Sequence, residues 1–293
     1  MEDIQFERGD IWEDPKGGHR VGCLDATDPQ DVARLMGREK ANLAVQDPPY
    51  NQVDFKIRKI SDYIEWSEKW VDNTIAVLSD DSNFYIWMGA DQNDGFQPLP
   101  DFMIMMRDKP VDTRSFVTMR NQRGYGTQKN WMAVRQELLY YVKGNPRFEV
   151  QYTDIPKKTK GYYKKVNGKV TENIERSKSD CIRPGNVWYD IQQVFYKMHE
   201  NVKPCKSQKP LASAERIIES SSSEDDLVID FFSHSGTTLL QSEISNRRCY
   251  TMDMDPEYCR LTVKRLQWFR ETGKRGWQNE DPNSVESFQS SLF

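Results

Sequence analysis

The chain has 293 residues, of which 37% are hydrophobic and 29% charged, a balance that predicts a soluble globular protein with one large domain or a domain carrying an insertion. The formal net charge of −4 at pH 7 argues against a protein that coats nucleic acid indiscriminately, so any nucleic-acid contact must come from local basic clusters. No apolar run is long enough to cross a bilayer and the acidic N-terminal residues are unlike a signal peptide, so we expect a cytoplasmic protein without a membrane partner.

The cysteines and histidines indicate neither disulfide bonds nor a metal. The three histidines include no HExxH motif, and no two cysteines form a CxxC pair. We therefore expect no metal and reduced thiols that mostly pack in the core. The five cysteines are Cys23, Cys181, Cys205, Cys249 and Cys259.

The first elements alternate between strand and helix. Residues 19–24 are predicted to form a short strand. Asp28 then provides an N-cap, with Pro29 at the first position of a segment whose apolar residues have helical spacing. The apolar run at residues 43–45 is the next strand. Strand, helix and strand in this order predict a parallel α/β sheet.

The rest of the chain continues this alternation. An amphipathic helix is predicted at residues 61–78 and a loop rich in Asp, Gly and Pro at 89–100. Helical spacing also marks residues 192–200 and 211–218, and a polar break follows at 220–226. Further strands are predicted at 83–88, 115–119, 137–142, 184–188, 227–229 and 249–252.

A rigid loop follows the strand at residues 43–45. Each of its two prolines fixes its own φ and pushes the preceding residue out of the helical region, so the backbone has few conformations left. A carboxylate and a backbone carbonyl that grip both N–H bonds of an aromatic amine would localise the lone pair on its nitrogen, and a stacked ring would hold the base. A surface turn rich in Pro and Asp is the simpler alternative. We expect these four residues to be catalytic: Asp47, Pro48, Pro49 and Tyr50.

Two stretches in the middle of the chain combine basic and aromatic residues. No acidic residue occurs between Arg114 and Gln136, and six lysines surround two tyrosines at residues 157–169. Such clusters suit a phosphate backbone and an unstacked base, although a solvated hairpin whose lysines protect a sheet edge is an equal alternative for the lysine run. Their position beside a catalytic loop favours DNA, with contacts expected from Arg123, Lys129, Lys157, Lys158, Lys160, Lys164 and Lys165.

A second motif begins with the buried strand at residues 227–229, which runs into a loop of small residues and then a helix. The helix N-terminus offers backbone N–H groups and a positive dipole end to an anion. Asp253 follows the next strand, and an acidic residue about twenty positions after such a turn can accept both hydroxyls of a ribose. The pattern predicts a cofactor with a ribose and a carboxylate or phosphate.

The order of these segments resembles that of a known family, the amino-group DNA methyltransferases that use S-adenosylmethionine, and within it the permuted β group. Members carry an Asp-Pro-Pro-Tyr loop first, a target-recognition region next and the cofactor loop last. Residues 47–50, the basic middle and residues 230–238 follow that order here. Residues 23–28 resemble the family's CGDATD segment, residues 209–216 the segment before its cofactor loop, and residues 253–258 its EIDPEY segment.

The resemblance implies a Rossmann-like α/β fold: a seven-stranded, mostly parallel sheet with helices on both faces, circularly permuted and carrying an inserted target-recognition region. It implies a catalytic half at residues 1–143, a target-recognition and DNA-binding insertion at 144–205, a cofactor-binding half at 206–270 and a C-terminal tail at 271–293. It points to a bacterial or phage-encoded enzyme of the restriction-modification type and leaves a homodimer open.

The same resemblance implies S-adenosyl-L-methionine as cofactor and S-adenosyl-L-homocysteine as product. Asp253 would take the ribose and Asp25 the amino group of the cofactor's adenine, while the loop at 230–238 would hold the amino-acid end with Lys209 nearby. The expected cofactor-binding residues are Asp25, Ala26, Asp47, Lys209, Asp230, Phe232, Ser235, Gly236, Thr237, Thr238 and Asp253.

One residue departs from the family pattern, and one bears on the substrate. His234 stands where the family has glycine, which costs on the order of 1 kcal/mol if the position needs a positive φ. Aspartate at position 47 resembles the adenine enzymes, whereas serine is more usual in the cytosine ones. We therefore predict a DNA methyltransferase that flips an adenine and methylates its N6. The alternatives are a cytosine-N4 DNA methyltransferase, an RNA substrate and a non-catalytic DNA-binding module with a methyltransferase shell.

Overall fold

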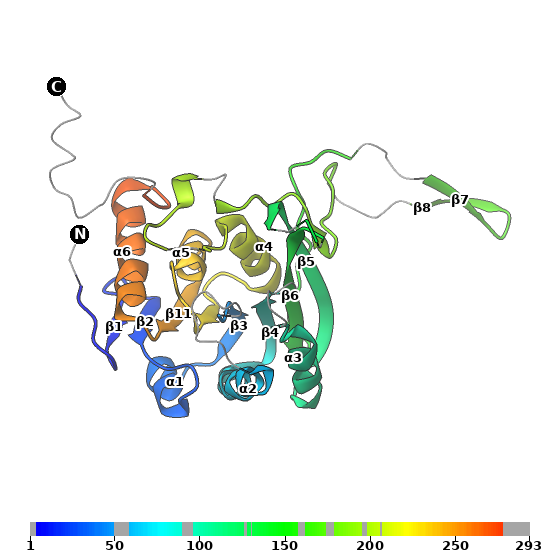
Figure 1. The fold of residues 1–293 in the computed structure, drawn as a ribbon. Coiled ribbons are helices and arrows are strands. Elements are labelled where there is room, and N and C mark those ends of the chain that lie inside the picture. The colour runs from blue at the N-terminus through cyan, green and yellow to red at the C-terminus, as the bar shows by residue number, and fades with distance from the viewer. Residues whose placement is uncertain are drawn as a thin grey trace, which may run out of the picture.

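The computed structural model describes residues 4–49, 59–89, 96–125, 128–129, 131–157, 162–173, 179–194, 198–205 and 207–277. Within these residues, nine strands form one sheet in the order β1-β2-β11-β10-β3-β4-β6-β5-β9 (Figure 1). The strands of this sheet are β1 (Ile11–Glu13), β2 (His19–Cys23), β3 (Ala41–Gln46), β4 (Leu78–Met88), β5 (Asp112–Tyr125), β6 (Ala133–Lys143), β9 (Val187–Trp188), β10 (Leu227–Asp230) and β11 (Arg248–Asp253).

The middle of the sheet is parallel. β10 lies between β11 and β3, β11 pairs with β2, and β3 pairs with β4, all in the same direction. β6 is antiparallel to β4, and β5 is antiparallel to β6. The carboxyl ends of five neighbouring strands therefore meet at one edge, where loops can build a site. The predicted α/β fold is confirmed, and β1 and β9 extend the sheet beyond the expected seven strands, while the circular permutation stays a prediction.

Three helices cover one face of the sheet. These are α1 (Pro29–Met36), α2 (Ile60–Val77) and α3 (Leu99–Met105), followed by a 3-10 turn. Trp70 of α2 and Phe102 of α3 are fully buried, and their rings stack with centroids 5.9 Å apart. This face carries the largest apolar cluster of the described residues, so it anchors the strands whose ends form the site.

Three further helices cover the opposite face (Figure 1). They are α4 (Leu211–Ser221), α5 (Thr237–Ile244) and α6 (Pro256–Thr272). Ile217 of α4 is buried with residues of β3, β4 and β10, and Val263 of α6 is buried with residues of β2 and β11. Both faces of the parallel strands are therefore shielded from solvent, as their continuous apolar runs require.

One helix begins as its sequence predicts, and a second, which was not predicted, has the same kind of start. The Asp28 side chain accepts a hydrogen bond from the Gln30 N–H at 2.8 Å, with Pro29 as the first residue of α1. Asp255 caps α6 in the same way through the Glu257 N–H, at 2.9 Å. Each cap satisfies one backbone donor that the first helical turn leaves unpaired.

Two predictions of local structure need adjustment. Of the predicted loop at 89–100, residues 89 and 96–98 are irregular as expected, but its last two residues already belong to α3, because proline is compatible with the first turn of a helix. In the described part of the predicted helix at 192–200, residues 192–193 are irregular, and 3-10 geometry is present at residue 194 and at Met198–Glu200. The Glu200 carbonyl accepts hydrogen bonds from the side chains of Gln208 and Arg265.

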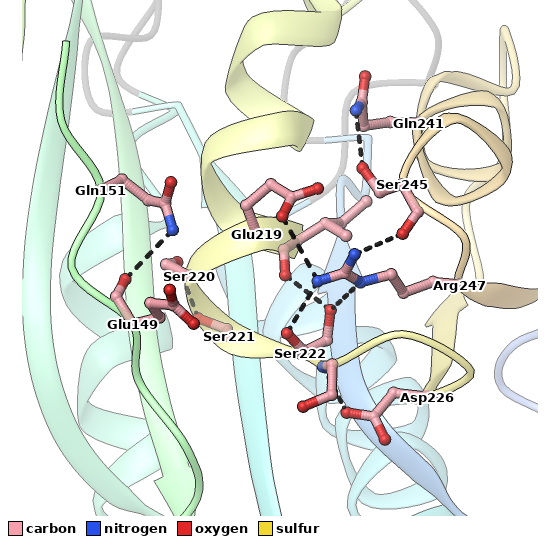
Figure 2. Close-up of polar contacts among 12 residues, drawn as sticks. Glu149, Gln151, Glu219, Ser220, Ser221, Ser222, Asp226, Gln241, Ser245 and Arg247 are labelled. Carbon is pink, nitrogen blue, oxygen red and sulfur yellow. Dashed lines mark hydrogen bonds and ion pairs between the residues drawn. The ribbon is translucent and has the colours of Figure 1, made fainter.

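The serine-rich segment after α4 is a buried junction. α4 extends to Ser221, and the serines at 220–222 are buried. Arg247, which precedes β11, donates to the Ser222 hydroxyl at 3.1 Å and to its carbonyl at 3.0 Å, and lies 3.5 Å from the Glu219 carboxylate (Figure 2). These bonds fix the end of α4 to the neighbouring strand, so the predicted polar break is short and packed.

The lysine-rich stretch forms a hairpin, as the alternative interpretation predicted. β7 (Tyr162–Val166) pairs antiparallel with β8 (Lys169–Asn173), and Figure 1 shows the pair standing away from the large sheet. Its shape is compatible with both alternatives for this stretch, so DNA contact there stays a prediction.

The cysteines are all free and four of them are buried, as expected of packing thiols. Among the described residues, no helix is both long and apolar enough to span a bilayer.

Candidate active site

Four carboxylates lie at the carboxyl ends of four adjacent parallel strands. Asp25 follows β2, Asp253 ends β11, Asp230 ends β10 and Asp47 follows β3, and these strands are neighbours in that order. At a spacing of about 4.8 Å between strands, the row spans on the order of 15 Å. The loop with Asp47 and the loop after Asp230, far apart in sequence, therefore lie on the same edge, as the predicted chemistry requires.

Asp47 forms an ion pair that joins the two loops. Lys209 Nζ donates to both carboxylate oxygens of Asp47, at 2.7 and 2.8 Å. The Lys209 side chain is 10% exposed and that of Asp47 26%, and the ammonium group lies 5.1 Å from the centre of the Trp87 ring. A carboxylate oxygen has more than one lone pair, so Asp47 can accept further hydrogen bonds from a ligand while the ion pair persists.

The two loops are also tied by the residue before Asp47. The amide oxygen of the buried Gln46 side chain accepts a hydrogen bond from the Phe231 N–H at 2.8 Å. Beyond Asp47, Pro48 is buried and Pro49 is half-buried. Tyr50 lies outside the described residues, so its stacking role stays a prediction.

The turn that starts α5 has a strained backbone. Gly236 has a φ of 68°, and a Cβ there would lie 3.0 Å from the Thr262 side chain, so glycine is required. His234 has a φ of 44°, which confirms that this position needs the left-handed region and that histidine costs on the order of 1 kcal/mol there. The His234 ring packs edge-on against Tyr258, with centroids 4.8 Å apart, and this contact offsets part of the cost.

Asp230 is buried at the base of this turn. Burial raises the pKa of its carboxyl to about 7, and the charges of Asp47 and Asp253 act in the same direction. Hydrogen bonds from the Thr238 hydroxyl and from the Phe232 N–H favour the ionised form and limit the rise. Asp230 therefore changes charge near neutral pH, and a cation beside it would keep it ionised.

Asp253 ends the strand next to that of Asp230. Its carboxylate accepts hydrogen bonds from the His234 N–H and the Asp255 N–H, both at 3.0 Å. Burial nevertheless raises its pKa to about 6. The half-buried carboxylate is fixed in orientation by these two donors, and its remaining lone pairs can accept hydroxyl groups.

Asp25 begins the loop after β2. Its Oδ1 accepts hydrogen bonds from the N–H and the hydroxyl of Thr27, at 2.8 and 2.7 Å, and the Arg8 guanidinium lies 3.6 Å from its Oδ2. The buried Ala26 is fixed through its carbonyl, which accepts a hydrogen bond from Asn73 of α2 at 2.9 Å. The loop is thus rigid and leaves Asp25 half-buried at the end of the row.

The other predicted cofactor residues surround the turn. The Ser235 and Thr237 hydroxyls are 3.2 Å apart, and the Thr237 hydroxyl donates to the Lys209 carbonyl at 3.2 Å. Phe232 packs against α2, with its ring centre 6.0 Å from that of Trp66 and 5.3 Å from that of Trp70. The structure therefore brings the predicted cofactor residues together along one edge; their roles stay predictions.

One buried residue behind the turn was not found from the sequence. Arg265 of α6 is fully buried, and its guanidinium donates to the Ser235 carbonyl at 2.8 Å and to the Thr237 hydroxyl at 3.1 Å. Burial lowers its pKa to about 10. Arg265 supports the turn from the side of α6. Its position on the apolar side of that helix, which the helical periodicity of the sequence contains, is the signal that could have identified it as buried.

The predicted DNA-binding residues that the structure describes belong to other elements than this row of carboxylates. Lys129 is exposed between β5 and β6, and Arg123 belongs to β5. Lys157 Nζ donates to the Ser179 carbonyl at 3.0 Å. Lys164 and Lys165 belong to β7 of the separate hairpin. Lys158 and Lys160 lie outside the described residues.

Relatives with this arrangement are known. The type II methyltransferase M.HpaI of Haemophilus parainfluenzae is 29% identical over 233 residues, which cover 77% of this chain and 68% of that protein. Among solved structures, the PvuII DNA methyltransferase, named as cytosine-N4-specific, aligns with a TM-score of 0.63 at 14% identity over 94% of this chain and 91% of that chain. A complex of M1.HpyAVI with SAM aligns with a TM-score of 0.55 at 18% identity over 85% and 100% of the two chains.

The family assignment rests on a longer match. The sequence model of the family described as DNA methylase matches residues 41–264, which is more than half of the chain and includes both the Asp47 loop and the turn after β10. The resemblance found in the sequence is thereby confirmed. The chain belongs to the DNA methylase family, the methyltransferases that act on N6 and N4 amino groups.

Proposed function

We propose that this protein transfers the methyl group of S-adenosyl-L-methionine to the exocyclic N6 of an adenine in DNA. The observation that carries the proposal is the shared edge: Asp47, paired with Lys209, stands one strand away from Asp230 and two strands away from Asp253. A methyl donor held by Asp230 and Asp253 and an amine held by Asp47 would be neighbours. Positioning of this kind supplies much of the acceleration of a group transfer.

The residues along the edge suit this cofactor by their chemistry. The cofactor supplies a methyl group already activated on a sulfonium centre. Asp253 accepts hydrogen bonds from the ribose hydroxyls, and Asp25 accepts one from the amino group of the cofactor's adenine. Asp230 faces the ammonium group of the cofactor's amino-acid end. The N-terminus of α5, with Thr237 and Thr238, receives the carboxylate.

The loop after β3 holds the target base. Asp47 and the Pro48 carbonyl accept the two amino hydrogens and localise the lone pair on the nitrogen, and Tyr50 stacks on the base after it has left the duplex. Lys209 keeps the Asp47 carboxylate in one orientation through two short hydrogen bonds. Asp47 also takes up the proton that the nitrogen releases after transfer.

The choice of adenine rests on the aspartate that begins this loop. Mass spectrometry of nucleosides from DNA treated with the protein and S-adenosylmethionine tests it. N6-methyladenine is the expected product. N4-methylcytosine without N6-methyladenine would reject adenine and leave DNA amino-methylation intact.

One other function has specific support. The cytosine-N4 specificity in the name of the PvuII enzyme favours a cytosine-N4 methyltransferase. A DNA-binding module without activity would be recognised by an absence of S-adenosylmethionine binding in calorimetry. In either case we propose residues 144–205 and the predicted basic residues as the region that recognises DNA.

A further inference from the structure

The hairpin of β5 and β6 extends well past the edge that carries the active site. Asp47 lies level with Trp87 of β4, and Trp87 pairs with Leu138 of β6. β6 begins five residues earlier, at Ala133, which still pairs with Tyr125 of β5. At about 3.4 Å per residue, regular pairing continues to Arg120 and Arg135, roughly 10 Å beyond the level of Asp47, and after an irregularity in β5 the hairpin reaches Ala133, roughly 17 Å beyond it.

The described part of the tip exposes large apolar side chains. Trp131 is 93% exposed and Met132 is 60% exposed. Burial of an indole is favourable, and adjacent exposed apolar residues mark surfaces that bind a partner. Trp131 carries the most exposed large apolar side chain of the residues that the structure describes.

The charges on the same hairpin indicate what that partner is. Arg120 of β5 lies directly opposite Arg135 of β6, and both are exposed, as is Lys129 at the tip. Like charges at opposing positions destabilise an antiparallel pair. The Glu137 carboxylate lies 3.5 Å from the Arg135 guanidinium. The absence of acidic residues from 114 to 136 of the sequence favours a polyanion as the partner of this face.

The position of the hairpin relates it to the target base. β6 is two strands away from β3, so the hairpin rises on the order of 10 Å to the side of Asp47. A duplex that delivers one base to Asp47 would therefore meet the tip within a few base pairs. Flipping a base opens a gap in the stack, and apolar side chains can enter such a step and offset part of the cost of unstacking.

We propose that Trp131 is the wedge that enters the duplex where the target nucleotide leaves it, with Arg120 and Lys129 on the adjoining phosphates. This inference rests on the proposed function, since it requires a duplex whose target base is flipped towards Asp47. Trp131 then stacks on the bases that remain and makes the extruded state more populated. It is a positioning residue, because it touches neither the cofactor nor the reacting amine.

The test compares paired and unpaired targets. Once the recognised site is known from sequencing of modified bases in DNA of an expressing host, the steady-state rate at low DNA concentration is measured on a matched duplex and on one with a mismatched target base. Unpairing and unstacking cost a few kcal/mol and least for a mismatched base, so Trp131→Ala is expected to lower the rate about tenfold or more on the matched duplex and about threefold or less on the mismatched one. Trp131→Phe is expected to lie between these limits.

Fluorescence of 2-aminopurine at the target position gives a second readout. The wild type is expected to raise it when the base leaves the stack, and Trp131→Ala to reduce that rise. Ile104→Ala removes an apolar side chain that is 57% exposed on α3 and is expected to change neither readout. Calorimetric binding of S-adenosylmethionine checks that each variant retains the carboxylate row.

Each outcome is distinct. If the wild type methylates no DNA, the proposed function fails. If Trp131→Ala methylates both duplexes like the wild type, or loses the same factor on both, the wedge is overturned while the proposed function stands. A change from dimer to monomer in light scattering, with both rates kept, would assign the tip to a protein contact and also overturn the wedge.

Discussion

The carboxylate row and the β5–β6 hairpin belong to one sheet but are built in opposite ways. In the row, Asp230 and Asp253 are held by backbone and hydroxyl donors within a packed core, and Arg265 supports the turn from behind. On the hairpin, Arg120 faces Arg135 and Trp131 is almost fully exposed. The first region is complete without a macromolecular partner, whereas the second has charges and apolar surface that a partner would cover. In the functions proposed above, rigidity for a small cofactor and adaptability for a large polyanion would thus be separated within one sheet.

The largest expected effect tests the row at Asp47. Asp47→Asn keeps the shape but places two N–H donors where the amine needs acceptors, so the methylation rate is expected to fall on the order of 10³-fold. Calorimetric affinity for S-adenosylmethionine should be nearly unchanged. Asp101→Asn, at an exposed aspartate of α3, is the control. Full turnover by Asp47→Asn would remove the carboxylate from the mechanism.

Two glycines sharpen the comparison of packed and open regions. Gly236→Ala meets Thr262 at about 3.0 Å and a φ of 68°, whereas Gly168→Ala, in the β7–β8 turn at a φ of 77°, meets nothing within 4 Å. Both variants bear the conformational cost of about 1 kcal/mol, and only Gly236→Ala adds a clash and weakens cofactor binding. Thermal unfolding and calorimetry measure the two effects. Equal cofactor affinity in the two variants would contradict the tight fit of the turn.

The pH dependence of cofactor binding tests the raised pKa values of the row. Asp253 and Asp230, with pKa values of about 6 and 7, gain protons as the pH falls from 8 to 5.5, so they lose charge that hydroxyl and ammonium donors require. Affinity is expected to weaken over this range, and Asp253→Asn should remove the part near pH 6. The dissociation constant measured by calorimetry across the range decides the matter.

The same groups give folding the opposite pH dependence. Because their folded pKa values lie above the ordinary value of 3.8, the folded state binds more protons than the unfolded state between about pH 4 and 7. The free energy of unfolding of the free protein should therefore rise as the pH is lowered through this window. Denaturant titrations at pH 8 and pH 5.5, with Asp253→Asn for comparison, measure the change. A stability that falls over this window in the wild type and not in the variant would contradict the raised pKa of Asp253.

The smallest expected effect concerns the separate hairpin. Replacing Lys164 and Lys165 of β7 by glutamine should raise the dissociation constant for DNA and reduce the slope of its logarithm against the logarithm of salt concentration by up to about 1.8, or about 0.9 for each phosphate that is no longer neutralised. The comparison is with Lys69→Gln, on an exposed position of α2. An unchanged slope would remove this hairpin from the interface.

The sequence predicted the parts of the site that depend on local chemistry. The Asp28 cap and the apolar parallel strands each follow from a few neighbouring residues, and the structure contains them. The family's glycine at position 234 raised the question of a positive φ, which the structure answers with 44°. The shared edge followed from parallel strand order, because loops at the carboxyl ends of adjacent parallel strands must meet. The α/β fold and the family were therefore accessible before any coordinates.

The rest depends on contacts between distant segments. The ion pair of Lys209 with Asp47 joins residues 162 positions apart, and the support that Arg265 gives to Ser235 requires α6 to lie against the turn. Periodicity cannot report such contacts, because it counts only neighbours along the chain.

Lys209 belongs to both halves of the site at once. Its carbonyl accepts a hydrogen bond from Thr237 in the first turn of α5, while its ammonium group grips both oxygens of Asp47. A displacement of the start of α5 would therefore reach the counter-ion of Asp47 through a single residue. If α5 and Asp47 serve the two subsites proposed above, occupation of one would bear directly on the geometry of the other.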